Sequence, residues 1–414
     1  MRRKLVIVFD EFPFTFGEYS FVKTELEYLA ERFEVSILSL SASMELTVEL
    51  DERIALYHCI RKFGIKEKAL AVIQFLLSRD GQAEIKRILR TKQQIKGRLY
   101  DAIVYFGSAK QLQKYIRKQH LLQGDELIYS YWFNANCLAF LMEKRRYPKL
   151  RVISRIHGYD LYEERNIHCR QPFRECMDEL IDKVFFVADA GKQYYLERWA
   201  PMQSKNGKYV VAPIGTVNSH VSHRQAPVRK NRYFHIVSCS SVISLKRVHL
   251  IIEGLAQITD INVKWTHFGT GDLWDEIIER AAVLLGAKEN ISYDLAGFVP
   301  VEDIMQFYEN NDIDCFITTS STEGCPVSIQ EAMSYGIPVI ATAVGEIPNM
   351  IKGNGILLPE NPLPQDVTTA ISRLYTASEE EILAMRESSR ALWEKRYDAM
   401  KNAEIFVKDL EEIV

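Results

Sequence analysis

The sequence predicts an α/β fold made of two doubly wound domains, in which helices cover both faces of parallel β-sheets. The chain has 414 residues, whereas one domain usually needs about 100 to 200. Its 47% hydrophobic and 26% charged residues are typical of a globular protein with packed cores. Short β-branched runs alternate with helical stretches along the whole chain, which indicates βαβ units around parallel sheets.

The expected strands fall into two series separated by helical patterns such as Phe21 to Glu31 and Asn134 to Lys144. The first series is Leu5 to Phe9, Val35 to Leu40, Ala102 to Tyr105, Leu127 to Tyr131, Arg151 to Ile156 and Lys183 to Val187. The second series is Phe234 to Ser238, Lys264 to Phe268, Ile291 to Leu295, Cys315 to Thr319 and Pro338 to Ala341.

These series define the expected domains. Residues 1–212 form a first Rossmann-like domain, residues 213–232 lose all periodicity and are the expected linker, and residues 233–377 form a second Rossmann-like domain. Residues 378–414 are helical, and we expect them to pack back across both domains. Ligands of open parallel sheets bind beyond the carboxyl ends of the strands, so two facing sheets are expected to form a cleft.

Composition excludes several classes of protein. A net charge of -3 gives no overall field for nucleic acid. The apolar run Leu5 to Phe9 is shorter than the 7 to 15 residues of a secretory leader, and no run of about 18 apolar residues predicts a membrane span. The seven cysteines are scattered without a C-x-x-C pair, which favours reduced thiols and a cytoplasmic location.

The segment Ser320 to Pro338 carries the densest chemistry. It follows an expected strand, and Pro326 and Gly336 are placed to begin and end a helix. The positive amino end of that helix is suited to a pyrophosphate. Glu323 and Glu331 would stand on the order of 10 Å apart, a reach suited to the sugar and the ribose of one extended ligand. On spacing alone, a capping acid and a solvated helix residue explain them equally well.

In its wider context this segment resembles glycosyltransferase family 4, which has the GT-B fold. Glu323 and Glu331, eight positions apart and followed by Gly336 to Ile340, are similar to the family's E-x7-E signature. Further similarities occur in family order between about residues 234 and 358. They are the strand His235 to Cys239, the pair Lys246-Arg247, the G-x-G loop Phe268 to Asp272, the base-facing segment Ala296 to Val299 and the G-G-x-P-E-like loop Val344 to Asn349.

The resemblance implies roles in binding a donor. Glu323 would contact the donor sugar, Glu331 the ribose hydroxyls and Lys246 the diphosphate, whose charge grows as the glycosidic bond breaks. The remaining donor-site residues implied are Arg247, Ser241, Gly269, Gly271, Phe298, Val299, Gly324, Cys325, Pro326 and Val327. Ser241 stands where the family usually has an arginine. Either Lys246 and Arg247 suffice together, or the phosphates are held differently; a solvated basic pair is the simpler alternative for these two residues.

The first half contributes two candidates. Gly17, in the loop Phe12 to Glu18, is similar to a family glycine that lets the backbone approach the ligands, although an ordinary strand-to-helix turn explains it equally well. His157 follows an expected strand and resembles the family's histidine beside the donor sugar, with a purely structural histidine as the alternative. The segment Arg155 to Tyr162, with Ser238 to Ser240, resembles enzymes that build bacterial exopolysaccharides of the colanic acid kind.

Residues 61–120 are strongly basic, with fifteen Lys and Arg against four acids. Interleaved apolar residues make this region a candidate for peripheral contact with an anionic membrane on its inner face, against the alternative of a merely solvated helical region.

Together these features predict a retaining glycosyltransferase that moves a hexose from a nucleotide sugar, with UDP-sugar ahead of GDP-mannose, onto a lipid-linked or growing polysaccharide acceptor. We expect no cofactor and no metal requirement, because helix amides and cations replace the charge of a divalent ion. A nucleotide-sugar epimerase of the same fold and a catalytically silent nucleotide-sugar binder remain the alternatives.

Overall fold

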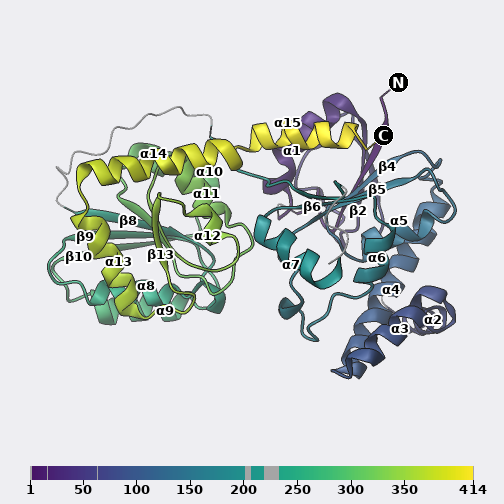
Figure 1. The fold of residues 1–414 in the computed structure, drawn as a ribbon, viewed down its shortest axis with the longest axis horizontal. Coiled ribbons are helices and arrows are strands. Elements are labelled where there is room, and N and C mark those ends of the chain that lie inside the picture. Colours follow the sequence, from purple (N-terminus) through teal and green to yellow (C-terminus); the bar gives the residue numbers. More distant parts are fainter. Residues whose placement is uncertain (1, 16, 63, 201–206, 219–232, 414) are drawn as a thin grey trace. The chain divides into compact units, whose positions relative to one another are not determined.

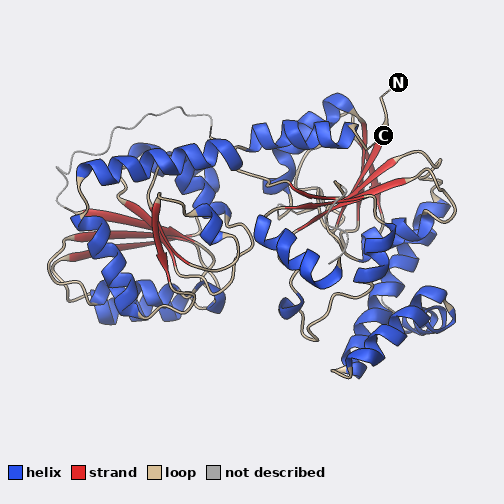
Figure 2. Cartoon of the chain, in the orientation of Figure 1, coloured by secondary structure: helices blue, strands red, loops and turns tan. Residues whose placement is uncertain are grey.

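A computed structural model describes residues 2–15, 17–62, 64–200, 207–218 and 233–413 of the chain. The chain divides into two compact units (Figure 1). The N-terminal unit comprises Met1–Ile214 with Ala403–Val414, and the C-terminal unit comprises Gly215–Asn402. In each unit a central sheet is enclosed by helices (Figure 2).

The N-terminal unit contains a parallel sheet of seven strands in the order β3-β2-β1-β4-β5-β6-β7. The strands are β1 Lys4–Phe9, β2 Glu34–Ser39, β3 Ala55–His58, β4 Leu127–Ser130, β5 Arg151–Ile156, β6 Lys183–Phe186 and β7 Tyr209–Val211. The helices are α1 Tyr19–Arg32, α2 Ile65–Leu77, α3 Arg79–Thr91, α4 Ile95–Lys118, α5 Ala135–Glu143, α6 Arg174–Leu180, α7 Asp189–Trp199 and α15 Ala399–Glu411, with a 3-10 turn at Glu163–Arg165.

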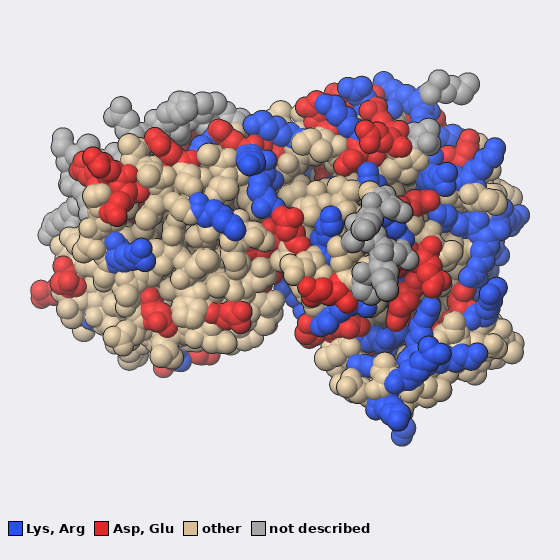
Figure 3. Space-filling view, in the orientation of Figure 1, with Lys and Arg blue, Asp and Glu red and all other residues tan. Residues whose placement is uncertain are grey.

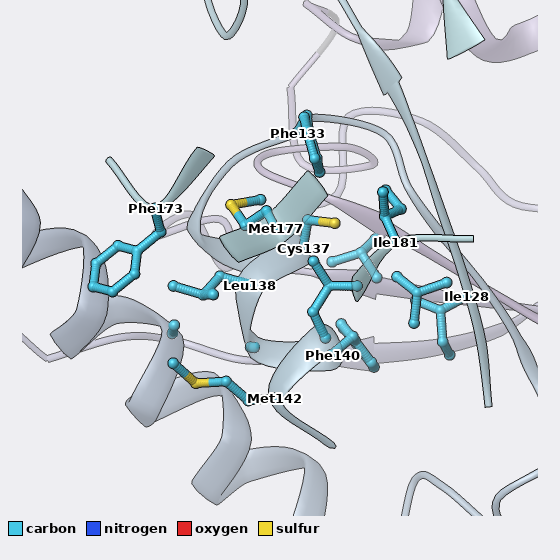
Figure 4. Packing of buried hydrophobic residues seen from close by; sticks show 14 of the residues in the cluster. Ile128, Phe133, Cys137, Leu138, Phe140, Met142, Phe173, Met177 and Ile181 are labelled. Atoms are coloured by element: carbon cyan, nitrogen blue, oxygen red, sulfur yellow. The ribbon is translucent and has the colours of Figure 1, made fainter. Parts of the chain in front are cut away.

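Successive residues of β1 face two different cores. Val6 and Val8 belong to the core shared with α4 and α5, part of which is shown in Figure 4, whereas Leu5, Ile7 and Phe9 belong to the core shared with α1 and α15. Side chains alternate across a strand, so a strand buried on both faces reads as one continuous apolar run.

The C-terminal unit contains a parallel sheet of six strands in the order β10-β9-β8-β11-β12-β13. The strands are β8 Phe234–Cys239, β9 Val263–Phe268, β10 Ile291–Gly297, β11 Cys315–Thr318, β12 Val339–Thr342 and β13 Gly355–Leu358. The helices are α8 Val248–Ala256, α9 Trp274–Leu285, α10 Val301–Asn310, α11 Val327–Ser334, α12 Ile347–Met350, α13 Pro364–Thr376 and α14 Glu379–Arg396, with a 3-10 turn at Ser244–Lys246. Here too alternate residues of the central strand β8 face different cores.

One expected strand is wrong. Residues Ala102 to Tyr105 lie inside the long helix α4, where Ala102 and Phe106 are buried one helical turn apart. A short apolar run fits a buried strand and a buried helical segment equally well, and here the flanking residues continue the helical pattern. Three short strands, β3, β7 and β13, were not expected from the sequence.

The C-terminal segment forms two helices that pack in different units. Helix α14 belongs to the C-terminal unit, whereas Phe406, Val407 and Leu410 of α15 enter a core of the N-terminal unit. Of the linker expected at 213–232, residues 219–232 lie outside the described part of the chain. None of the helices within the described residues has the length and apolar character needed to cross a membrane.

Candidate active site

Strand order locates the candidate site in each unit. Both sheets reverse direction of strand addition at their centre, between β1 and β4 in the N-terminal unit and between β8 and β11 in the C-terminal unit. Ligands of doubly wound sheets bind outside the carboxyl ends of the strands at such a switch point. The loops after these four strands are therefore expected to carry the functional residues.

The switch point of the C-terminal unit brings Lys246 and Glu323 together. Lys246 ends the 3-10 turn after β8, and Glu323 lies in the loop after β11. The Lys246 ammonium donates a hydrogen bond to Glu323 Oε1 at 2.5 Å, and both side chains are partly buried. The acid and the lysine to which the sequence assigned separate roles thus form one ion pair.

Gly345 supports the backbone under Glu323. It has φ +55°, and a Cβ at this position would lie 1.8 Å from the Glu323 carbonyl oxygen, so only glycine fits without displacing that loop. The next residue, Glu346, donates its backbone N–H to the Gly324 carbonyl at 3.2 Å. The G-G-x-P-E-like loop therefore holds the residues that precede α11.

Helix α11 begins as the sequence predicts. Pro326 occupies the N-cap with φ -65°, the helix runs over Val327–Ser334, and Gly336 has φ +66° just beyond its end. Gly324 and Cys325 lie in the loop that leads into the helix, and the Cys325 sulfur accepts a hydrogen bond from Gln330 Nε2 at 3.1 Å. The first amides of a helix have no partners inside the helix, so this end is suited to an anion.

Glu331 is buried in the second turn of α11. Burial raises the pKa of its carboxyl to about 7. The pKa of the nearby Cys239 thiol at the end of β8 is raised by burial; Glu331 raises it further, and Lys246 lowers it. Glu331 and Lys246 therefore both act on the carboxyl end of β8.

Arg247 has its guanidinium engaged by the protein. It donates to the carbonyl oxygens of Thr319 at 2.7 Å and Ser320 at 2.9 Å, and also to the Glu360 carbonyl and the Asn361 side chain. These bonds fix the end of β11, from which the Glu323 loop starts. The arrangement favours a positioning role for Arg247 over the diphosphate contact that the sequence suggested.

The other donor residues implied by the sequence line neighbouring loops. A Cβ at Gly269 would lie 2.0 Å from the Ser240 carbonyl oxygen, and one at Gly271 would lie 2.5 Å from the Val242 carbonyl oxygen, so the two loops pack backbone against backbone. Ser241 is exposed between them. Beyond β10, Phe298 is 79% exposed and Val299 packs partly into the core.

His157 follows β5 in the N-terminal unit and lies against two aromatic rings. Its ring centroid is 4.9 Å from Tyr131 and 4.4 Å from Trp132. Both ring nitrogens are buried without a hydrogen-bond partner. Burial, followed by the charge of Arg155, lowers its pKa to about 3, so the imidazole is neutral, with one donor and one acceptor nitrogen.

The same edge holds polar residues that were not predicted from the sequence. The Glu18 carboxylate accepts the backbone N–H groups of Asp10, Glu11 and Phe12 and the indole N–H of Trp132. The Asp10 carboxylate accepts hydrogen bonds from the side chains of Asn134 at 3.0 Å and Asn136 at 2.5 Å. The sequence signal that could have located them is position, because Asp10 directly follows β1 and Trp132 and Asn134 lie in the loop after β4.

Gly17 is exposed in the loop before α1, where its neighbour Phe16 lies outside the described residues. Among the residues that the structure describes, no group of three or more His, Cys, Asp or Glu is arranged to hold a metal ion.

Comparison with solved structures identifies the class of fold as GT-B. The apo form of the lipopolysaccharide outer core galactosyltransferase WaaB aligns over 99% of this chain and 100% of its own, with a TM-score of 0.68 and 15% identity. HepE of Anabaena, solved in complex with UDP and glucose, aligns over 99% of this chain and 100% of its own, with a TM-score of 0.64 and 15% identity.

The C-terminal unit is further defined by sequence. Residues 234–377 match the family described as glycosyl transferases group 1. This match includes Lys246, Glu323 and Glu331.

Two similar proteins are named as glycosyltransferases of exopolysaccharide biosynthesis. WcaL of Escherichia coli strain K12, a glycosyltransferase assigned to colanic acid biosynthesis, is 28% identical over 179 residues, which cover 39% of this chain and 42% of that protein. The amylovoran biosynthesis glycosyltransferase AmsK of Erwinia amylovora is 31% identical over 159 residues, which cover 36% of each protein. The matched regions thus span about two fifths of these relatives.

Proposed function

We propose that this protein is a retaining glycosyltransferase that transfers a hexose from a nucleotide sugar to an acceptor in cell-surface polysaccharide synthesis. A UDP-sugar is the first candidate donor and GDP-mannose the second. The HepE complex with UDP and glucose supports a uridine nucleotide, and the names of WcaL and AmsK support an exopolysaccharide product.

The observation that carries this proposal is the ion pair of Lys246 with Glu323 at the β8/β11 switch point, next to the start of α11. A diphosphate leaving group gains negative charge as the glycosidic bond breaks, and a fixed ammonium and helix amides stabilise that charge. An ammonium has three donors, so Lys246 binds a phosphate oxygen while it keeps Glu323 oriented towards the sugar. Glu331 binds the ribose hydroxyls.

In the proposed reaction the bond between the anomeric carbon and the diphosphate oxygen breaks, and the acceptor oxygen bonds to that carbon on the same face. The acceptor proton leaves with the nucleoside diphosphate. Because Lys246 and the helix amides supply the positive charge, we propose that no divalent cation or other cofactor is required. His157 contributes hydrogen bonds to a sugar hydroxyl in its neutral form.

The acceptor is a lipid-linked or growing saccharide, which we place at the cytoplasmic face of a membrane and assign to the N-terminal unit. The support is chemical: the β1/β4 edge presents Asp10, Asn134 and Trp132, and carboxylates, amides and indoles are groups that bind sugars through hydrogen bonds and ring contacts.

A donor screen with the Glu323→Gln variant tests the proposal. We expect wild-type protein to release UDP or GDP only when an acceptor extract is present, and Glu323→Gln to lose transfer while its nucleotide affinity stays within a few fold. Glu302→Gln, an exposed acid of α10, is the matched control. Equal transfer by wild type and Glu323→Gln would falsify the assignment, and conversion of the nucleotide sugar into its epimer without an acceptor and without net release of nucleotide favours the epimerase.

A further inference from the structure

The solvent-facing side of α2 in the N-terminal unit is apolar. Ile65 is 87%, Leu77 77% and Ile73 55% exposed. The same side also carries other exposed apolar residues, namely Leu70, Val72 and Leu76. Single exposed apolar residues need no explanation, but a continuous exposed patch on a soluble domain marks an interaction site.

This apolar face is distinct from the face with which α2 packs on its own unit. Ala71 and Phe75, four residues apart on one side of the helix, are buried. Phe75 packs edge-on against Phe106 of α4, with ring centroids 5.7 Å apart, and a Cβ at Gly107 of α4 would lie 2.7 Å from the Ala71 Cβ. At 3.6 residues per turn, Ile65, Ile73 and Leu76 lie on the opposite side, so the helix is already docked and its second apolar face has no partner among the described residues.

Positive charge surrounds this face. Lys66, Lys68 and Arg79, on α2 and at the start of α3, are exposed and form no ion pair among the described residues. In Figure 3 the lobe formed by α2 and α3, at the lower right, shows Lys and Arg side chains around uncharged surface. Figure 1 places these two helices at the outer end of the N-terminal unit, beyond α4.

The few acids of residues 61–120 do not offset this charge. Asp80 pairs with Arg145 at 2.5 Å, Glu84 with Arg170 at 2.8 Å and Asp101 with His168 at 2.6 Å. Asp80 and Glu84 are therefore paired with arginines, Asp101 contacts His168, and Glu67 is the remaining acid. Arg87 and Arg117 pair with Glu179 and Glu143, so the charge left to act on an external anion is that of residues such as Lys66, Lys68 and Arg79.

We propose that α2 is the membrane-docking element of this protein, and that it lies in the plane of an anionic bilayer with Ile65, Ile73 and Leu77 inserted among the lipid headgroups and acyl chains. An apolar face bordered by lysines is the chemistry of an interfacial helix, and anionic headgroups attract basic residues. Binding of an acidic protein partner would need only the basic residues. The exposed side chains of Ile65 and Leu77 instead favour an apolar medium such as the acyl region of a bilayer. This inference deepens the proposed function, since a lipid-linked acceptor requires the enzyme at a membrane surface.

Vesicle flotation of the full chain tests the proposal. The vesicles are phosphatidylglycerol with phosphatidylethanolamine, or phosphatidylcholine alone as the neutral surface. We expect binding to the anionic vesicles and a loss of about a hundredfold in the Ile73→Gln/Leu77→Gln variant, since burial of one such side chain is worth about tenfold in partitioning. Lys66→Gln/Lys68→Gln should weaken binding to anionic vesicles by about tenfold or more and leave neutral vesicles unaffected.

The matched control is Val283→Gln/Leu363→Gln in the C-terminal unit, where the two residues are 73% and 68% exposed. It should bind vesicles like the wild type. UDP calorimetry on every variant separates the two proposals, because loss of vesicle binding with unchanged UDP affinity concerns α2 alone. Equal vesicle binding by the wild type and the α2 variant overturns the inference, as does a stable dimer by sedimentation that only the α2 variant abolishes.

Discussion

The two sheets share a strand order, but the loops at their switch points differ in charge. We call the β8/β11 end of the C-terminal sheet the charged edge, and the β1/β4 end of the N-terminal sheet, with the adjacent β5, the neutral edge. At β8/β11, Lys246 is held within 2.5 Å of Glu323 and a helix begins beside them, so charge is concentrated. At β1/β4 and the adjacent β5, the Glu18 carboxylate accepts hydrogen bonds from backbone amides. His157 lies against two aromatic rings, and burial keeps it neutral. Under the proposed function, this difference adapts one architecture to a diphosphate in one unit and to neutral hydroxyls in the other.

Removing the ammonium at the charged edge should have the largest effect. We expect Lys246→Met to lower kcat by roughly 100-fold to 1000-fold, as loss of one preorganised donor to a developing anion does. Steady-state kinetics measure it, with Lys352→Met, an exposed lysine of the same unit, as control. A Lys246→Met enzyme with unchanged kcat would place charge stabilisation elsewhere.

Glu331→Gln should weaken UDP binding about tenfold, because a hydrogen bond to a charged group is worth about 1.5 to 3 kcal/mol. The same variant should be more stable at pH 8. The folded-state pKa of Glu331 is raised to about 7, so this carboxyl lowers the unfolding free energy as the pH rises from about 4.5 to about 7, by up to about 3 kcal/mol. Calorimetry measures the UDP affinity, and urea unfolding at pH 5 and pH 8 measures the stability. A Glu331→Gln variant that is less stable than the wild type at pH 8 contradicts the stability prediction, and unchanged UDP affinity contradicts the binding prediction.

Substitution of His157 at the neutral edge should reduce transfer less than substitution of Lys246, and it should not change how the rate depends on pH. With its pKa lowered to about 3, His157 should not titrate between pH 5 and 8, and the pH–rate profile of transfer should keep its shape in His157→Gln. We expect that variant to lose about tenfold in transfer and to retain UDP affinity. An imidazole resonance that titrates near pH 6.5 in the folded protein is the contrary result.

Removal of divalent metal ions by a chelator is expected to leave activity unchanged. If Lys246 and the amides of α11 supply the charge that a divalent ion supplies elsewhere, EDTA should leave turnover unchanged. Restoration of lost activity by Mg²⁺ or Mn²⁺ would show that the charged edge is incomplete without a cation.

The charged edge was largely predictable from the sequence, because its signals are local. Pro326 and Gly336 bounded a helix expected over residues 326–335, and α11 spans Val327–Ser334. Lys246 and Glu323 each follow a strand of one parallel sheet, so their shared edge followed from topology.

What sequence reasoning missed depends on contacts between distant residues. Glu18 and Trp132 are 114 positions apart, and Arg247 donates to acceptors 72 to 114 positions away. The strand expected at Ala102 to Tyr105 failed for a related reason: the helical burial of Ala102 and Phe106 depends on α2 and α5, which pack against α4. Local patterns carry no information about which elements will meet.

Hydrogen exchange by mass spectrometry, with and without UDP, tests the central claim most directly because it reads both edges in one experiment. We predict that UDP protects amides in peptides covering residues 240–247 and 320–331, and that Glu331→Gln and Lys246→Met reduce this protection. Protection confined to residues 10–18 and 131–136, with none over residues 320–331, would contradict the assignment of the nucleotide to the C-terminal unit.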